Sequence, residues 1–293
     1  MKNNVLNIFF VIDKNYIVPF TVTLTSILEN NKDLELQVFI IHELDQNSQL
    51  DLSCNFFREK YSLNVNLIKF EDKYFNDFHT EHHITKATYF KLLLGEVIPE
   101  TITEGLYIDC DTVVNGSLKG LCDLSFTSNS EGSEVSLLTV KDIKADREIT
   151  RLKKLGINLT NYFNAGVLFI NLRKWRAENM AQKMIEVGQK YNEHLTYLDQ
   201  DIQNIFFRVD QGDLEDTYNK DASIKYTRIP LILHYLGNSK PWHFVDNGPY
   251  KHIYHNYLKM TPFKNLKTEN ITLKNVARKY VRLFRQKLNI QRS

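Results

Sequence analysis

Short apolar runs alternate with amphipathic stretches through the first 110 residues of the chain. The apolar runs are rich in β-branched and aromatic residues, as in buried strands, and lie at 5–12, 36–41, 64–70 and 105–109. Helical patterns lie between them, at about 17–30, 46–60 and 85–95. This alternation predicts parallel strands joined by crossover helices, which form an open, doubly wound α/β sheet.

The second half of the chain is less regular. Strands are predicted at 134–140 and 166–172, and helices at about 173–191 and 198–208. A loop-rich segment then ends near residue 248. Since no internal repeat and no Gly/Ser-rich linker interrupts the chain, we predict one catalytic domain over 1–260, a Rossmann-like, mostly parallel sheet with a smaller C-terminal part.

The composition is that of an ordinary globular protein, with 43% hydrophobic and 25% charged residues. No apolar run approaches the ~18 residues that a membrane-spanning helix needs, so we expect a soluble or peripheral protein. The three cysteines, at 54, 110 and 122, follow no metal or redox spacing, and no signal peptide precedes the first strand. These features indicate a reducing cytoplasm.

A basic tail at 261–293 contrasts with an acidic body. The tail holds nine Lys and Arg against one Glu, a net charge of +8, which leaves −6 on the first 260 residues. Within 270–291, apolar residues follow helical spacing among the basic ones: Val276, Tyr280, Leu283, Phe284 and Leu288. We interpret this as an amphipathic helix that binds an anionic membrane surface. The alternatives are a helix docked on the acidic body and a disordered tail. Nucleic acid is not expected, because few aromatic residues are present for base stacking.

The stretch YIDCDTVV at 107–114 places two acids one residue apart at the end of an apolar run. In extended chain Asp109 and Asp111 would project to one side and Cys110 to the other. Two like charges in one volume need a proton, a basic side chain or a divalent cation as neutraliser; a solvated turn is the alternative. Asp13 follows the first strand and Asp109 the fourth, so both are expected at the sheet edge where ligands bind.

Four further segments place polar groups at strand ends or turns. Asp13, Asn15 and Tyr16 lie in FVIDKNYIVPF, and a turn of small residues opens NAGVLFINL at 164–172. Asp199, Gln200 and Asp201 begin a predicted helix, where capping is the simpler interpretation. The stretch HYLGNSKPWH supplies His234, Gly237 and Lys240.

Together these motifs resemble family 8 glycosyltransferases. The resemblance runs from about residue 5 to 245 and includes D-x-N-Y, Y-I-D-x-D, N-A-G-V-L-x-I-N, D-Q-D-x-x-N and H-Y-x-G-x-x-K-P-W in the family's order. It is strongest to bacterial galactosyl- and glucosyltransferases of lipopolysaccharide and lipooligosaccharide synthesis. The resemblance implies a GT-A fold and retaining transfer of a hexose from a UDP-sugar.

The resemblance also implies a metal site. Asp109, Asp111 and His234 match the residues that bind a divalent metal in the family, usually Mn²⁺, with Mg²⁺ possible. Carboxylate oxygens and one imidazole suit such an ion, which would neutralise the UDP leaving group.

Other roles follow by the same resemblance. Asp13, Asn15 and Tyr16 would contact uridine and ribose, and Gly237 and Lys240 the diphosphate. The donor-sugar shell would comprise Asp142, Asn164, Ala165, Asp199 and Gln200. Lys91 in YFKL is a further nucleotide-binding candidate, at a position where the family often has arginine. Lysine keeps the charge of arginine but loses its bidentate fork.

Retention requires either two displacements or attack from the leaving group's own face. Asp199 and Gln200 are the catalytic candidates, and we favour front-face attack. We expect galactose as donor sugar, with glucose close behind, and a saccharide acceptor, lipid-linked, at the cytoplasmic face of the plasma membrane. The alternatives are a protein or glycoprotein-glycan transferase and a UDP-sugar-binding protein or hydrolase.

Overall fold

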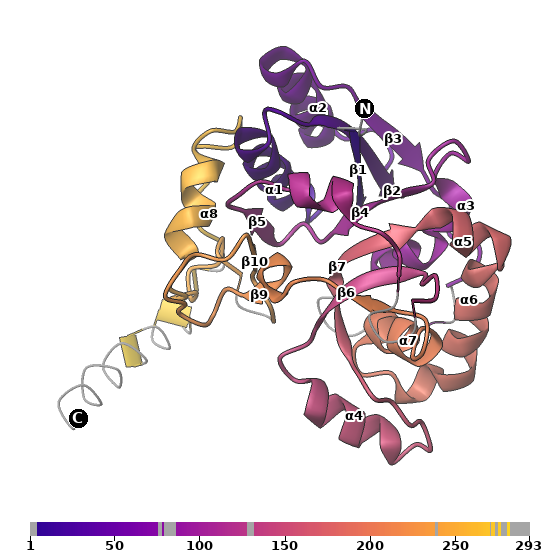
Figure 1. Cartoon of the computed structure of the whole chain (residues 1–293). Coiled ribbons are helices and arrows are strands. Elements are labelled where there is room, and N and C mark those ends of the chain that lie inside the picture. Colours follow the sequence, from indigo (N-terminus) through magenta and orange to yellow (C-terminus); the bar gives the residue numbers. More distant parts are fainter. Residues whose placement is uncertain are drawn as a thin grey trace.

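The structure is a computed structural model of the chain (Figure 1). It describes residues 5–75, 78, 86–127, 132–237, 240–269, 271–272, 275–276 and 280–281. Most of the predicted amphipathic helix at 270–291 therefore lies outside the described residues. Within the described part, no helix is both long enough and apolar enough to cross a membrane.

The main sheet has seven strands in the order β3-β2-β1-β4-β7-β6-β8 (Figure 1). Their bounds are β1 Val5–Ile12, β2 Glu35–His42, β3 Val65–Lys69, β4 Glu104–Ile108, β6 Leu137–Lys141, β7 Phe163–Asn171 and β8 Gly212–Asp213. Neighbours pair in parallel except at β7, which runs antiparallel to both β4 and β6. The predicted mostly parallel sheet is confirmed.

Helices cover both faces of this sheet. Their bounds are α1 Ile17–Asn30, α2 Ser48–Tyr61, α3 Leu94–Val97, α4 Ala145–Lys153, α5 Leu172–Ala177, α6 Met180–Tyr191, α7 Leu198–Phe206 and α8 Lys251–Leu258. Strand β1 shows why two faces are covered, because its successive side chains enter different cores. Ile8 and Phe10 pack with α1 and α2, whereas Phe9 packs with the core under α5, α6 and α7.

Two predicted helices differ from the observed ones. The helix expected at 173–191 is divided into α5 and α6 by Asn179, whose φ of 55° is left-handed and incompatible with a continuing helix. The helix expected near 85–95 begins as a 3₁₀ helix, Lys86–Leu93, before α3. Helices α4 and α8 were not predicted, since α4 lies in a polar stretch and α8 beyond the loop-rich segment.

Strand β7 begins three residues earlier than predicted. Asn164, Ala165 and Gly166 lie inside this strand, so the expected turn of small residues was wrong. The nine residues of β7 are all buried, as in a central strand covered on both faces.

A small second sheet joins distant parts of the chain. It consists of β5 (Thr112–Val114), β10 (Ile232–His234) and β9 (Lys220–Asp221), in that order. The antiparallel pairing of β10 with β5 sets His234 opposite Thr112, next to the acids that follow β4. This sheet was not predicted, because each of its strands has only two or three residues.

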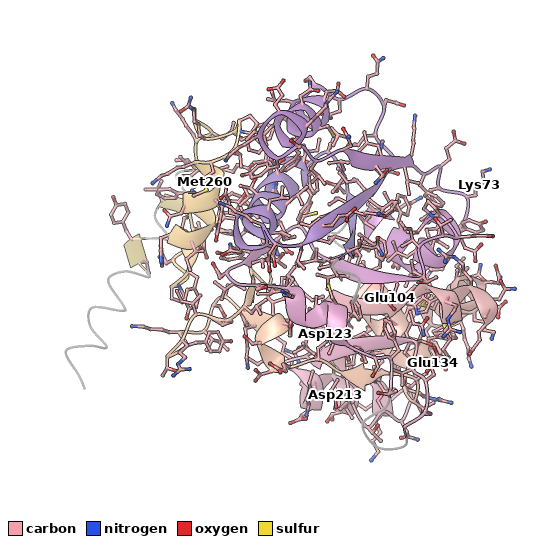
Figure 2. The ribbon with its side chains drawn as sticks, turned by 45° about the horizontal axis from the view of Figure 1, so that its top comes forward. Lys73, Glu104, Asp123, Glu134, Asp213 and Met260 are labelled. Carbon is pink, nitrogen blue, oxygen red and sulfur yellow. The ribbon has the colours of Figure 1, made fainter. Side chains whose placement is uncertain are left out.

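The predicted tail begins with residues that contact the body. Phe263 is buried in a cluster with α8, and the backbone of Glu269 forms an isolated parallel β-bridge with that of His243. Figure 2 shows Met260, two residues after α8, on the opposite side of the molecule from Lys73. Beyond this point Ile271, Tyr280 and Val281 are exposed, and Val276 is half-buried.

Candidate active site

A pocket of about 470 Å³ lies at the carboxyl ends of β1 and β4. Because these strands are parallel neighbours, Asp13 and Asp109 meet at one edge, as predicted. The predicted site residues that line the pocket are Asp13, Tyr16, Lys91, Asp109, Asp111, Asp142, Asn164, Ala165, Asp199, Gln200, His234, Gly237 and Lys240. Asn15 is exposed and is not among the lining residues.

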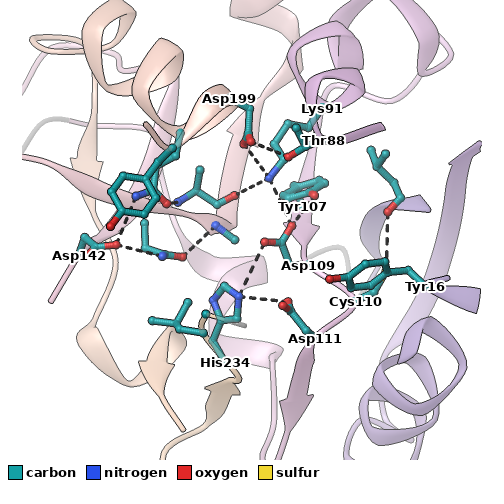
Figure 3. Close-up of a pocket in the computed structure, with 18 of the residues that line it drawn as sticks. Tyr16, Thr88, Lys91, Tyr107, Asp109, Cys110, Asp111, Asp142, Asp199 and His234 are labelled. Carbon is teal, nitrogen blue, oxygen red and sulfur yellow. Dashed lines mark hydrogen bonds and ion pairs between the residues drawn. The ribbon is translucent and has the colours of Figure 1, made fainter. Parts of the chain in front are cut away.

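Asp109 and Asp111 lie in a turn rather than in extended chain. Strand β4 ends at Ile108, and the chain turns at Cys110 and Asp111. The backbone N–H of Asp109 donates to the carbonyl of Gly166 at 2.8 Å, which fixes the start of this turn against β7. The two acids still converge on His234, so the convergence was predicted correctly from an incorrect local geometry (Figure 3).

Lys91 is a buried cation next to Asp109. Its buried ammonium contacts Asp109 Oδ1 at 3.3 Å, Asp199 Oδ2 at 3.0 Å and the carbonyl of Ala165 at 3.3 Å. Three N–H donors thus face three oxygens, an arrangement that a lysine satisfies without a guanidinium fork. The neighbouring carboxylates raise the pKa of Lys91 despite its burial, so the group stays charged.

Asp111 is neutralised by other groups. Its Oδ2 accepts from the buried Lys240 ammonium, which also donates to the carbonyl of Tyr235 at 2.8 Å. Its Oδ1 lies 3.1 Å from His234 Nε2. Although burial opposes ionisation, the Lys240 ammonium holds the pKa of Asp111 below its ordinary value.

The three metal candidates meet the requirements for a divalent cation. Asp109, Asp111 and His234 each offer one ligand atom, and these atoms lie within 4.8 Å of one another. Asp111 Oδ1 is buried and has no hydrogen-bond partner among the described residues. An acceptor atom in this position, facing an imidazole nitrogen and a second carboxylate, suits a cation with oxygen and nitrogen ligands.

Gly166 makes room for this cluster. A Cβ at this position would lie 2.2 Å from His234 Cε1 and 2.7 Å from Asp109 Oδ2. The absence of a side chain on β7 therefore lets two of the three candidate ligands approach the strand. Gly166 belongs to the run of small residues that opens NAGVLFINL, and its lack of a side chain leaves space for the metal candidates.

The predicted sugar shell forms a hydrogen-bonded group on the opposite wall. Asn164 Nδ2 donates to Asp142 Oδ2 at 3.1 Å, and Gln200 Nε2 lies 3.4 Å from the same oxygen. Gln200 Oε1 accepts from the backbone N–H of Ala165 at 3.0 Å. Four of the five predicted residues are thus linked.

Asp199, the fifth, belongs to a different contact set. Its carboxylate accepts from Thr88 and pairs with Lys91 (Figure 3). Burial raises the pKa of Asp199, because Lys91 is shared with Asp109 and does not fully offset desolvation. The preceding Leu198 has a φ of 41°, a strained value for a leucine, which sets the direction of Asp199 at the start of α7.

The nucleotide candidates form the remaining wall. Asp13 Oδ1 accepts from the backbone N–H of Asn15 at 2.8 Å, so this acid shapes the turn that follows β1. The ring of Tyr16 meets that of Trp242 edge-to-face, with centroids 6.0 Å apart. Gly237 has a φ of +75°, a conformation that favours glycine.

Sequence reasoning missed several residues of the site. Tyr107 donates its hydroxyl to Asp109 Oδ1, and burial together with that carboxylate raises the pKa of Tyr107 far above its ordinary range. Asn219 contacts His234 Nδ1 at 2.9 Å. Tyr107 stood inside the quoted motif and could have been noted, whereas Asn219 and Thr88 carry no local signal.

The family model for glycosyl transferase family 8 matches residues 7–246. The chain belongs to glycosyltransferase family 8. It is 27% identical to a lipopolysaccharide 1,2-glucosyltransferase of Escherichia coli, over 98% of this chain and 88% of that protein. It is 26% identical to a lipopolysaccharide 1,3-galactosyltransferase of Salmonella typhimurium, over 81% and 73%.

Among solved structures, the galactosyltransferase LgtC in complex with donor and acceptor sugar analogs is similar in fold. The TM-score is 0.77 at 23% identity, and the match covers 93% of this chain and all of that one. The predicted family and GT-A fold are thus confirmed, and this family 8 chain is a glycosyltransferase.

Proposed function

We propose that this glycosyltransferase moves a hexose from a UDP-sugar to a saccharide acceptor and depends on a divalent cation, Mn²⁺ or Mg²⁺. The observation that carries the proposal is the convergence of Asp109, Asp111 and His234 in the wall of the pocket. A cation bound there would neutralise the charge that develops on the diphosphate leaving group.

Charged and aromatic side chains around the pocket support a nucleotide donor. The Tyr16 ring offers a face for uracil near the end of β1, beside Asp13. The buried ammoniums of Lys91 and Lys240 supply positive charge near the two acids. In our proposal Gly237 and Lys240 contact the diphosphate, and Asp13 and Asn15 contact the uridine side.

The acceptor is proposed to be a saccharide of a lipopolysaccharide or lipooligosaccharide. Support comes from the named relatives, which act on lipopolysaccharide as glucosyl- or galactosyltransferases. Galactose remains the favoured donor sugar, with glucose next. The two differ by the orientation of one hydroxyl, which the hydrogen-bonding group around Asp142 would discriminate.

Transfer is proposed to retain anomeric configuration by front-face attack. Both nucleophile candidates already have partners: Asp199 contacts Lys91 and Thr88, and Gln200 contacts Ala165 and Asp142. An ion-paired carboxylate and an amide are weak nucleophiles, so these residues would position the sugar instead. A glycosyl group found on Asp199 or Gln200 by mass spectrometry would overturn this assignment.

We also propose that the tail holds the protein at the cytoplasmic face of the plasma membrane. The exposed Ile271, Tyr280 and Val281 among basic residues support this role. Truncation after Glu269 is the appropriate test, because the preceding residues pack on the body. The truncated protein should lose binding to anionic vesicles and keep its thermal stability; unchanged vesicle binding would refute the anchor.

The function is tested by UDP release from a panel of UDP-sugars in wild type and Asp111→Ala, with Mn²⁺ or EDTA. Release from one donor that EDTA and the substitution both abolish is the expected result. Release that is insensitive to both would refute the metal-dependent proposal. Sugar attached covalently to a protein acceptor, with none on lipooligosaccharide, would favour a protein-modifying transferase.

A further inference from the structure

One side chain outside the proposed ligand set contacts a candidate metal ligand directly. Asn219, in the turn before β9, places its Oδ1 2.9 Å from His234 Nδ1. Both side chains are buried, with exposed fractions of 9% and 4%. Which imidazole nitrogen carries the proton therefore depends on which way the Asn219 amide faces.

A backbone N–H fixes that direction. The N–H of Gly166 donates to the Asn164 side chain at 3.0 Å, so the Asn164 atom facing it must be the carbonyl oxygen. Asn219 meets the same oxygen at 2.9 Å and must present its NH₂ group there. The NH₂ group of Asn164 donates to Asp142 Oδ2 at 3.1 Å, which supports the same orientation of the Asn164 amide.

The tautomer of His234 follows from this chain of bonds. With its NH₂ directed at Asn164, Asn219 presents its carbonyl oxygen to His234, and Nδ1 must be the protonated nitrogen. The lone pair of Nε2 then faces Asp111 Oδ1 at 3.1 Å and Asp109 Oδ2 at 3.8 Å. We propose that Asn219 is a positioning residue that holds His234 in the Nδ1–H tautomer, so that Nε2 is available as the metal ligand.

The carboxylates give this role its purpose. Asp109 and Asp111 would otherwise favour a proton on Nε2, because that proton could hydrogen-bond to them. A protonated Nε2 cannot bind a cation, so such a tautomer would compete with the metal. An acceptor at Nδ1 shifts the balance in favour of metal binding, as outer partners of metal-bound histidines do. This inference rests on the metal site of the proposed function.

The wild-type protein tests the tautomer directly, without metal. Two-bond ¹H–¹⁵N correlation spectra at about pH 8.5, where an ordinary imidazole is neutral, distinguish the two protonated nitrogens. The signals of His234 are assigned by their loss in His234→Gln. We expect the proton on Nδ1. A proton on Nε2 would overturn the inference.

Substitutions then test the consequence for binding, by calorimetric titration with Mn²⁺. Asn219→Leu removes the acceptor, so affinity should fall by roughly 10- to 100-fold and the Nδ1–H signature should be lost. Asn219→Asp retains an acceptor at Nδ1, so it should keep that signature and bind Mn²⁺ more tightly than Asn219→Leu does.

Asn171→Leu is the matched control, because Asn171 is also buried and lies at the end of β7 opposite to Asn164. It should lower thermal stability without changing Mn²⁺ affinity. If Asn219→Leu affects affinity no more than this control, the inference is wrong. A wild type that binds no Mn²⁺ contradicts the proposed function. A wild type that binds Mn²⁺ with its metal-free proton on Nε2 contradicts only the role of Asn219.

Discussion

Two D-x-D triplets in this chain have the same spacing and different roles. Asp109 and Asp111 converge on His234, whereas Asp199 and Asp201 diverge. Asp199 faces Lys91 at the pocket, while Asp201 is fully buried on another side of α7. The backbone explains the difference. In the turn after β4 the two acids point to one site, but in a helix residues two apart are about 200° apart and cannot share a ligand.

The capping suggested for the start of α7 is not observed, because the N-cap residue is Tyr197 and no side-chain hydrogen bond caps this helix. Asp201 instead holds the segment that precedes the helix. Its Oδ2 accepts the backbone N–H groups of Thr196 at 2.8 Å and Tyr197 at 3.1 Å. Its Oδ1 accepts from Arg151 and from the hydroxyl of Tyr162. The same residue type thus builds a candidate metal site in one triplet and an interior hydrogen-bond centre in the other.

The largest effect should come from the first triplet. Asp111→Asn removes a charged candidate ligand, so transfer should fall by about 10³-fold, since a catalytic cation contributes several kcal/mol. Titration with Mn²⁺ measures the loss of metal affinity, and UDP release measures the loss of transfer activity. Asp201→Asn is the comparison variant and should retain Mn²⁺ affinity. Equal losses of Mn²⁺ affinity in both variants would remove the distinction between the triplets.

Gly166→Ala should weaken the metal site while leaving all three candidate ligands in the sequence. The added Cβ would collide with His234 and Asp109, so we expect Mn²⁺ affinity to fall on the order of 10- to 100-fold. Gly188→Ala is a control, because its Cβ would collide with Phe78, 2.4 Å away, in the core. The control should lose stability and keep Mn²⁺ affinity; the opposite result would contradict the importance of Gly166 for the site.

Asp201→Asn should lower the free energy of unfolding by about 2–4 kcal/mol, because it weakens a buried centre that accepts from Arg151 and Tyr162. Urea unfolding measures this change. Asp146→Asn, at an exposed ion pair with Lys141, should change stability by less than about 1 kcal/mol. A loss in Asp201→Asn no larger than in this control would show that the carboxylate is not a structural centre.

The smallest effect is a pH dependence of opposite sign in the two triplets, measured on metal-free protein. The folded pKa of Asp111 is lowered, so its stabilising contribution is present above the unfolded pKa of about 4 and is lost as the pH falls. The folded pKa of Asp199 is raised, so its ionisation destabilises the fold as the pH rises.

The stability cost of Asp111→Asn should therefore shrink on acidification below about pH 4, whereas that of Asp199→Asn should grow on acidification from about pH 7 to pH 4. Urea unfolding at each pH measures both costs. Parallel trends in the two variants would contradict the assigned directions.

Much of the fold was predictable, because it depends on local patterns. The alternating residues of β1, the helix at 17–30 and the parallel arrangement all follow from side-chain periodicity. Asp13 and Asp109 were placed together because carboxyl ends of parallel strands share an edge. The break at Asn179 was not predicted, since the apolar spacing continues across it.

The sequence by itself determined the sheet, its ligand-binding edge and, through its motifs, the family. Only the tertiary structure decided how His234 reaches the two acids, through the pairing of β10 with β5. It also decided that Lys91 is shared between Asp109 and Asp199, and that Asn219 contacts the His234 ring. The physical reason is sequence separation. Side-chain periodicity reports on residues close together in the chain, whereas these contacts join distant segments that meet only when the sheets assemble.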